Sequence, residues 1–207
     1  LLVDEAQDLS PMQWRMLGRR GRTASWTVVG DAAQASWPDA AEAAEAREEA
    51  FGAKPRRSFH MDTNYRNASE IFAYAAEYIR RHEADADIPN AVRETGIEPT
   101  ERAVAASGRD SGAWATAAVE AARELTGAVD GAIAVITPQV HRVDVEAACE
   151  PLRAEHPQVV VIDPMSTKGL EYDATVVVDP EEIVAESPGG ARVLYVVFTR
   201  AAHRMVV

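Results

Sequence analysis

Residues 1–8 read LLVDEAQD, an apolar run that stops at two adjacent carboxylates, Asp4 and Glu5. Such a run predicts a buried strand that delivers its acidic residues to the carboxyl edge of a parallel sheet, where α/β proteins place phosphate chemistry. In that setting Asp4 would hold Mg²⁺ and Glu5 would activate a water molecule. An Asp-Glu pair on its own more often marks an apolar strand that ends in a solvated acidic turn, so the assignment depends on the rest of the chain.

Apolar runs and amphipathic segments alternate along the rest of the chain in the rhythm of α/β units. The expected further strands are 25–29, 57–61, 103–106, 132–136, 159–163, 175–179 and 203–207. The expected helices are 12–20, 40–51, 69–82, 114–125, 140–155 and 191–201. The polar stretch 83–100 contains two prolines and a glycine and is the expected flexible loop. The fold class is therefore α/β, with a mainly parallel sheet flanked by helices.

Composition restricts the classes of function. With 33 acidic and 21 basic residues among 207, the net charge of −12 argues against a surface that binds nucleic acid mainly through its phosphates, although local basic patches remain possible. A single cysteine, Cys149, excludes an internal disulfide and fits a reducing compartment. No apolar run approaches the ~20 residues that span a bilayer, and no secretory signal is visible, so we expect a cytoplasmic protein without a membrane partner. Because residue 1 is not Met, we expect the chain to begin inside a longer protein.

Five polar motifs follow one another in a fixed order. They are VDEAQD (3–8), VGDAAQ (29–34), NYRN (64–67), TKGLEY (167–172) and LYVVFTRA (194–201). Together they resemble the motifs of superfamily 1 helicase-type ATPases of the UvrD/Rep kind, and five ordered matches make chance similarity very unlikely. The resemblance spans residues 1–207 and implies a RecA-like P-loop NTPase motor. Residues 1–62 would be the C-terminal part of the first motor domain, and 63–207 the second domain, of the helicase C-terminal type.

The resemblance implies roles for five residues of the first segment. Asp4 would coordinate Mg²⁺, and Glu5 would polarise the attacking water. Gln7 would sense the γ-phosphate of ATP. Gln34 would contact that phosphate or its water, while Asp31 positions the loop. These residue types suit phosphoryl transfer, which needs a metal, an aligned nucleophile and cations on the developing charge.

The same resemblance assigns ATP binding and catalysis in the second segment. Its nucleotide-binding residues would be Tyr65, Lys168, Gly169 and Glu171. Tyr65 would stack on adenine and Glu171 would bind the ribose. Arg66 and Arg200 would be arginine fingers, so that ATP in the cleft joins the two domains and hydrolysis releases them. Taken alone, the same residues also fit a core tyrosine and arginines in surface ion pairs.

Two departures from DNA-translocating relatives bear on the partner. Met165 stands where a histidine that touches the strand usually precedes the Lys-Gly-Leu-Glu motif. Residues 35–39 lack the usual aromatic residues and Arg-Gly pair of the DNA track. Trp37 remains as a base-stacking candidate, although a buried structural tryptophan is an equally good account. Thr167 is the other candidate contact to nucleic acid.

Further features resemble the HelD branch of the superfamily, whose members use the motor against RNA polymerase. The chain has no room for an accessory domain between Asn67 and Val159, and residues 8–15 read DLSPMQWR. We therefore expect ATP and Mg²⁺ as cofactors, RNA polymerase as the partner and DNA as a possible one. The alternatives are a UvrD/Rep-like DNA helicase or a degenerate motor that only binds.

The phosphate-cradling pattern Gly-x-x-x-x-Gly-Lys-Ser/Thr occurs nowhere in residues 1–207. Its backbone N–H groups and lysine hold the ATP phosphates in P-loop enzymes. We expect the N-terminal remainder of the same protein to supply this loop, and the present chain alone to be inactive.

Overall fold

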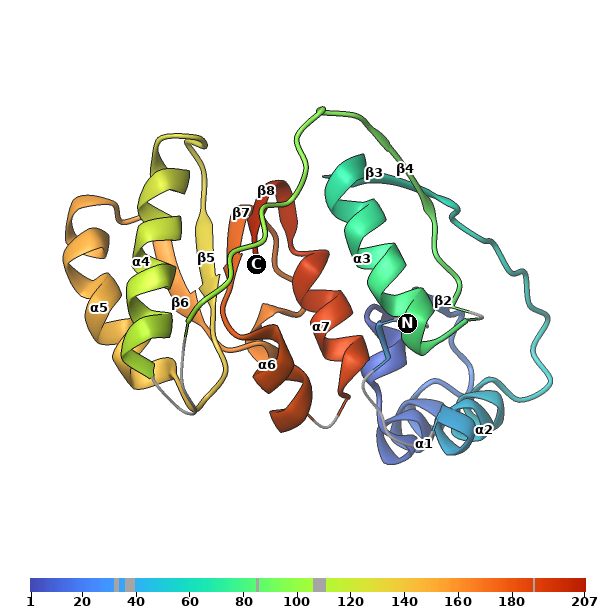
Figure 1. The fold of residues 1–207 in the computed structure, drawn as a ribbon. Coiled ribbons are helices and arrows are strands. Elements are labelled where there is room, and N and C mark those ends of the chain that lie inside the picture. Colours follow the sequence, from blue (N-terminus) through green and yellow to red (C-terminus); the bar gives the residue numbers. More distant parts are fainter. Residues whose placement is uncertain (32–33, 36–39, 85, 106–110, 188) are drawn as a thin grey trace. The chain divides into compact units, whose positions relative to one another are not determined.

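The computed structural model describes residues 1–31, 34–35, 40–84, 86–105, 111–187 and 189–207. The chain divides into two compact units, Leu1–Met61 and Asp62–Val207 (Figure 1). Both units combine helices with parallel strands, so the predicted α/β class is confirmed. None of the helices in these described ranges is long and apolar enough to cross a membrane.

The described residues of the first unit form two short parallel strands and two α-helices. Its elements are β1 (Leu2–Val3), the 3-10 turn η1 (Ala6–Asp8), α1 (Pro11–Arg20), β2 (Thr27–Val28) and α2 (Ala40–Phe51). Leu2 lies opposite Thr27 and Val3 opposite Val28. Because the two strands are parallel, the residues that follow them emerge at the same edge.

Helix α1 begins where the local sequence predicts a helix start. The Ser10 hydroxyl accepts a hydrogen bond from Gln13 N at 3.3 Å, and Ser10 N donates to the Gln13 side chain at 2.7 Å, which together form a capping box. The helix packs closely on α2 because Gly18 has no side chain. A Cβ atom at that position would lie 2.9 Å from Ala50 Cα. Trp14 is the largest buried side chain of the resulting small core.

The second unit contains a four-stranded parallel sheet and a separate pair of parallel strands. The sheet strands run in the order β6-β5-β7-β8 and are β5 (Ile133–Ile136), β6 (Val159–Ile162), β7 (Tyr172–Val177) and β8 (Ala201–Val206). The separate pair consists of β3 (Thr63–Ala68) and β4 (Asn90–Arg93). The helical elements are α3 (Ser69–His82), α4 (Ser111–Thr126), α5 (Arg142–Glu155), the 3-10 turn η3 (Met165–Thr167), α6 (Pro180–Glu186) and α7 (Ala191–Phe198).

Strand β5 lies inside the sheet and is buried on both faces. All four of its residues, Ile133 to Ile136, are 0% exposed, which explains why the strand is a continuous apolar run. Ile133 and Val135 pack in one core cluster with side chains of α4 and α5. Figure 1 shows α4 and α5 on one side of the four-stranded sheet, with α6 and α7 on the other.

Two predictions around the first half of the second unit are wrong. Residues 57–61 form no strand, and Phe59 is 85% exposed. The stretch 83–100 is not entirely a loop, because it contains strand β4. The strand in this region is therefore β3, which pairs with β4. Asn90 N donates to Asp62 O at 2.7 Å where this pairing begins.

The predicted strand 103–106 is also wrong for its described residues, 103–105. Residues 100–102, just before this stretch, pair with the end of β8 instead. Thr100 N donates to Met205 O at 2.9 Å, and Arg102 N donates to Val207 O at 2.7 Å. This short parallel segment covers the edge of β8.

A buried histidine connects three segments of the second unit. His141 is 2% exposed, and its Nε2 lies 2.9 Å from Asp179 Oδ2. Its Nδ1 lies 2.9 Å from Ser111 Oγ. Asp179 is also the N-cap of α6 and accepts a hydrogen bond from Glu182 N at 3.2 Å. These contacts fix the starts of α4, α5 and α6 at the carboxyl edge of the sheet.

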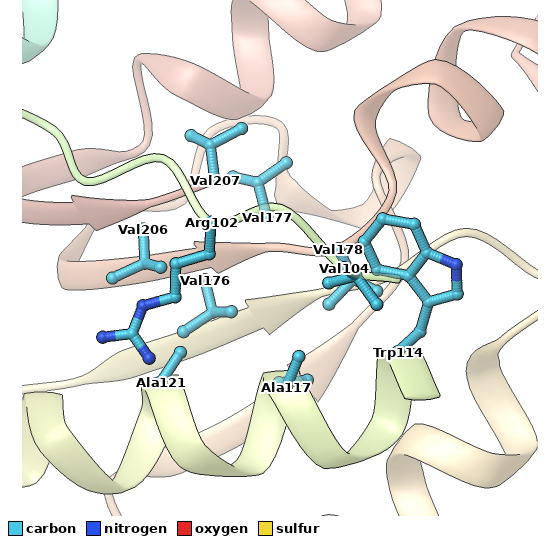
Figure 2. A pocket seen from close by; sticks show the side chains of 11 residues that line it. Arg102, Val104, Trp114, Ala117, Ala121, Val176, Val177, Val178, Val206 and Val207 are labelled. Carbon is cyan, nitrogen blue, oxygen red and sulfur yellow. The ribbon is translucent and has the colours of Figure 1, made fainter. Parts of the chain in front are cut away.

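A small apolar hollow lies between α4 and strands β7 and β8 (Figure 2). Its lining includes Trp114 and Ala121 from α4, Val176 from β7 and Val206 from β8. The cavity volume is about 20 Å³. That volume holds about one water molecule, so this hollow is not a nucleotide site.

Candidate functional site

The acidic pair predicted to act on a metal and on water lies in the turn after β1. Asp4 and Glu5 are both exposed. Glu5 has φ 49° and ψ 41°, a left-handed conformation that is uncommon for a non-glycine residue. Asp4 Oδ1 accepts a hydrogen bond from Glu5 N at 2.9 Å, which stabilises this turn. The turn therefore presents two carboxylates at the end of a parallel strand.

Three further predicted residues extend this cluster. Gln7 Nε2 donates to Glu5 Oε2 at 2.6 Å, and Gln7 Oε1 accepts from Asp31 N at 3.0 Å. Asp31 Oδ2 accepts from Gln34 Nε2 at 2.7 Å. Gly30 allows this approach, since a Cβ atom there would lie 2.8 Å from Gln7 Oε1. The structure thus brings Glu5, Gln7, Asp31 and Gln34 into one hydrogen-bonded chain.

The first unit offers carboxylate ligands of the kind that Mg²⁺ uses. Magnesium keeps several waters and usually takes one or two protein carboxylates together with substrate phosphates. An exposed Asp4 at a strand end suits that mode of binding. Among the described residues no group of three or more His, Cys, Asp or Glu side chains forms a complete metal cage. Trp37, predicted to stack on bases, lies outside the described residues.

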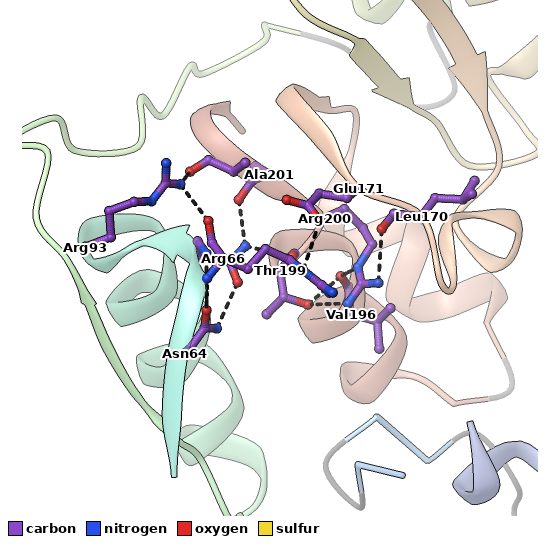
Figure 3. A network of polar contacts seen from close by, with 11 residues as sticks. Asn64, Arg66, Arg93, Leu170, Glu171, Val196, Thr199, Arg200 and Ala201 are labelled. Atoms are coloured by element: carbon purple, nitrogen blue, oxygen red, sulfur yellow. Dashed lines mark hydrogen bonds and ion pairs between the residues drawn. The ribbon is translucent and has the colours of Figure 1, made fainter. Parts of the chain in front are cut away.

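The NYRN motif forms the central four residues of β3 and is organised by its two asparagines (Figure 3). Asn64 Oδ1 accepts hydrogen bonds from Arg66 N at 2.9 Å and Asn67 N at 3.1 Å. Asn64 Nδ2 donates to Asn67 Oδ1 at 2.9 Å. These local bonds hold the backbone on both sides of Arg66, so the arginine side chain leaves the strand from a fixed base.

Asn67 also ties this motif to the LYVVFTRA motif. The residue is 2% exposed, and its Nδ2 donates to Thr199 O at 2.8 Å and to Ala201 O at 2.7 Å. These two carbonyl groups stand on either side of Arg200. Sequence reasoning missed both asparagines, although an amide residue on each side of a Tyr-Arg pair was a usable signal.

Tyr65 and Arg66 both lie at the surface. Tyr65 is 73% exposed, so it is not a core tyrosine. Arg66 Nε lies 2.9 Å from Glu171 Oε2, and the two side chains are 55% and 48% exposed. An ion pair this exposed contributes only about 0–1 kcal/mol, so it leaves Arg66 available to a more highly charged anion.

Arg200 lies in the turn between α7 and β8 and is 3% exposed. Helix α7 ends at Phe198, whereas the sequence predicted a helix that continues to residue 201. Arg200 Nε donates to Val196 O at 2.9 Å, and Nη1 donates to Leu170 O at 3.2 Å (Figure 3). Arg200 is therefore not a surface ion-pair residue, and it fixes the loop that carries Glu171.

The TKGLEY motif begins within η3 and continues as a turn into β7. Gly169 has φ 70°, a conformation that favours glycine. Lys168 is half-buried, and Glu171 is exposed. Thr167 is 0% exposed, and its hydroxyl donates to Pro164 O at 2.7 Å. The structure therefore does not present Thr167 to a nucleic acid, contrary to its predicted role, because the hydroxyl closes the 3-10 turn.

No protein-family model matches the chain, and no curated protein matches it. Among solved structures, the chain is similar to the C-terminal domain of a possible DNA helicase from Lactobacillus plantarum WCFS1. The sequence identity is 20%, the match covers 69% of this chain and 85% of that chain, and the TM-score is 0.46. A likeness at this level gives no information about activity.

Proposed function

We propose that the chain is the C-terminal motor portion of an ATP-dependent, superfamily 1 helicase-like ATPase. Residues 1–62 would complete the first RecA-like domain, and residues 63–207 would form the second. One observation carries this proposal: three motifs far apart in the sequence are bonded to one another in the second unit. Arg66 pairs with Glu171, Asn67 with the Thr199 and Ala201 carbonyls, and Arg200 with Leu170 O.

In this proposal the first unit prepares the metal and the nucleophile. Mg²⁺, when bound, neutralises phosphate charge and orients the terminal phosphate. Asp4 is its proposed protein ligand. Glu5 accepts a proton from the attacking water, and the amide of Gln7 holds the Glu5 carboxylate in place. Gln34, linked through Asp31, contacts the γ-phosphate or the water.

The second unit supplies recognition of the nucleotide and positive charge. Tyr65 offers an exposed ring to the adenine base, and Glu171 offers a carboxylate to the ribose hydroxyl groups. Arg66 exchanges its weak partner Glu171 for the γ-phosphate. The incoming ATP thereby frees Glu171 for the ribose at the same moment. Such an arginine can raise the rate of phosphoryl transfer by about 10³–10⁵-fold.

Arg200 is buried and supports this site through the loop that carries Glu171. Its guanidinium holds the Leu170 carbonyl next to Glu171. In the proposed ATP-bound state it adds a second positive charge behind the phosphates. Lys168 and Gly169 shape the same loop, with the glycine supplying the left-handed turn.

The proposed partner of the whole protein is RNA polymerase, as in HelD-like motors. A net charge of −12 disfavours extended contact with a polyanion. Met165, 42% exposed, offers no strong hydrogen-bonding group to a strand. The ATPase would then couple hydrolysis to the remodelling or release of RNA polymerase from nucleic acid.

A pull-down with the full-length protein tests the partner, together with ATPase assays with and without single-stranded DNA. Retention of RNA polymerase and ATP-dependent release of its nucleic acid would support the proposal. Strong stimulation by DNA, strand separation and no retained polymerase would establish the UvrD/Rep-like alternative. Nucleotide binding without turnover under every condition would identify a degenerate motor used as a binding module.

A further inference from the structure

Arg93 ends β4, in the stretch that the sequence predicts to be a flexible loop. It is opposite Ala68 in the pairing of β3 with β4. Its Nη2 donates to Arg66 O at 2.6 Å (Figure 3) and also to Ala202 O. Its Nη1 lies 3.0 Å from His203 Nδ1. One guanidinium therefore bonds the backbone of β3 to the backbone of β8.

The two carbonyl groups belong to residues at or next to the two proposed catalytic arginines, Arg66 and Arg200. One is the carbonyl of Arg66 itself, and the other is that of Ala202, two residues after Arg200. Asn67 forms a second tie between the same two strands, through the Thr199 and Ala201 carbonyls. Arg93 and Asn67 thus hold the β3 backbone, immediately after the Arg66 side chain, to β8 and the turn before it.

The chemistry of the position requires a guanidinium. Nη2 donates to both carbonyl oxygens while Nη1 faces the ring nitrogen of His203, and a lysine carries its three N–H donors on one nitrogen, which cannot take both places. Arg93 Nε is buried without a hydrogen-bond partner among the described residues. A buried unpaired donor costs about 1–3 kcal/mol, which offsets part of what the contacts of the same guanidinium contribute.

We infer that Arg93 is a positioning residue for phosphoryl transfer, which acts by fixing the backbone from which Arg66 reaches the γ-phosphate. This inference rests on the proposed function. Arg93 itself does not touch ATP. It holds the Arg66 carbonyl, and the Arg66 side chain contacts the reacting group.

The test uses the full-length protein with Arg93→Lys, and Arg81→Lys as a matched control, since Arg81 is an exposed arginine of the same unit that pairs with Glu77. Misplacement by about 1 Å can cost about 100-fold in rate, so we expect Arg93→Lys to lower kcat at least about 10-fold. The KM for ATP and the affinity for ADP should change less than about 2-fold, because ADP has no γ-phosphate. Binding of ADP with aluminium fluoride should fall in parallel with kcat.

A double-mutant cycle separates positioning from a general loss of structure. If Arg93 acts through Arg66, Arg93→Lys should have little further effect on kcat in the Arg66→Ala background. An equal fold-loss in both backgrounds would overturn the inference. So would a loss of activity that follows only the fraction of folded protein.

A second measurement does not depend on ATPase activity. In Arg93→Lys, hydrogen exchange should speed up at residues 63–68 and 201–203 but not in α5. Unchanged exchange at 63–68 would overturn the inference even if the protein is an ATPase. A wild-type protein that neither binds nor hydrolyses ATP would instead refute the proposed function, and the exchange result would still decide whether Arg93 holds β3.

Discussion

Arg66 and Glu171 are ion-paired at 2.9 Å, although each is proposed to bind a different part of ATP. With side chains 55% and 48% exposed, the pair adds little to stability. Each residue nevertheless keeps the other in a defined place until nucleotide arrives. Under the proposed function, the ion pair is the resting arrangement of two nucleotide ligands.

The first prediction concerns Glu171. In the full-length protein, Glu171→Gln should raise the KM for ATP about 10-fold, because it weakens a charge-assisted hydrogen bond to the ribose, and should change kcat little. Steady-state kinetics measure both values. Glu181→Gln on α6 is the matched control. A fall in kcat with unchanged KM would contradict the ribose role.

The second prediction concerns Glu5. Glu5→Gln should lower ATP turnover at least about 100-fold, the scale of a lost general base, while ATP binding is retained. Glu45→Gln, an exposed acid on α2, should leave turnover unchanged. Phosphate release and fluorescent-nucleotide binding provide the two measurements. Normal turnover in Glu5→Gln would remove Glu5 from the mechanism.

The third prediction concerns Glu70 and pH. Its own backbone amide at the start of α3 and hydrogen bonds from Thr95 and Gly96 lower the pKa of Glu70 from its ordinary value of 4.5 to about 2. Because the folded pKa is depressed, the stabilisation is fully present above about pH 4.5 and is lost as the pH falls toward 2. Thermal melts across this range should show a steeper decline for wild type than for Glu70→Gln. Parallel curves would disprove the linkage.

The fourth prediction concerns His141. His141→Ala should destabilise the second unit by about 2–4 kcal/mol, because it opens a cavity and leaves Ser111 Oγ and Asp179 Oδ2 without their partner. Urea denaturation measures the change. His82→Ala, at the exposed end of α3, should cost less than about 1 kcal/mol. Similar losses in the two variants would show that the buried contacts contribute little.

The sequence predicted those elements whose causes are local. Ser10 as N-cap, followed by Pro11 at the first helical position, marks the start of α1, and the apolar stripe from Ile71 to Ile79 marks α3. The continuous apolar run of β5 was equally clear. Residues 57–61 alternate in polarity as a strand should, but they pair with no strand in the part of the chain that the structure describes.

The elements that escaped prediction depend on distant partners. β3 is a polar segment that is extended because β4 and the Asn67 contacts hold it there. The site shows the same division. Residue types at the strand ends predicted phosphate chemistry. The burial of Arg200 and the hydrogen bonds of Arg93 to β3 and β8 depend on carbonyl groups that no local pattern reveals.

The large sequence separation between Asn67 and its hydrogen-bond acceptors has a consequence for folding during synthesis of the chain. Its two acceptor carbonyls lie 132 and 134 positions later in the sequence. Every strand pairing that the structure describes in this unit is parallel, so these pairings cannot form as hairpins and each must wait for a crossover segment. The buried amide therefore stays hydrated while the ribosome makes nearly the whole unit. Folding should be slow and should end with β8, so chaperones can act on an incomplete domain for most of translation.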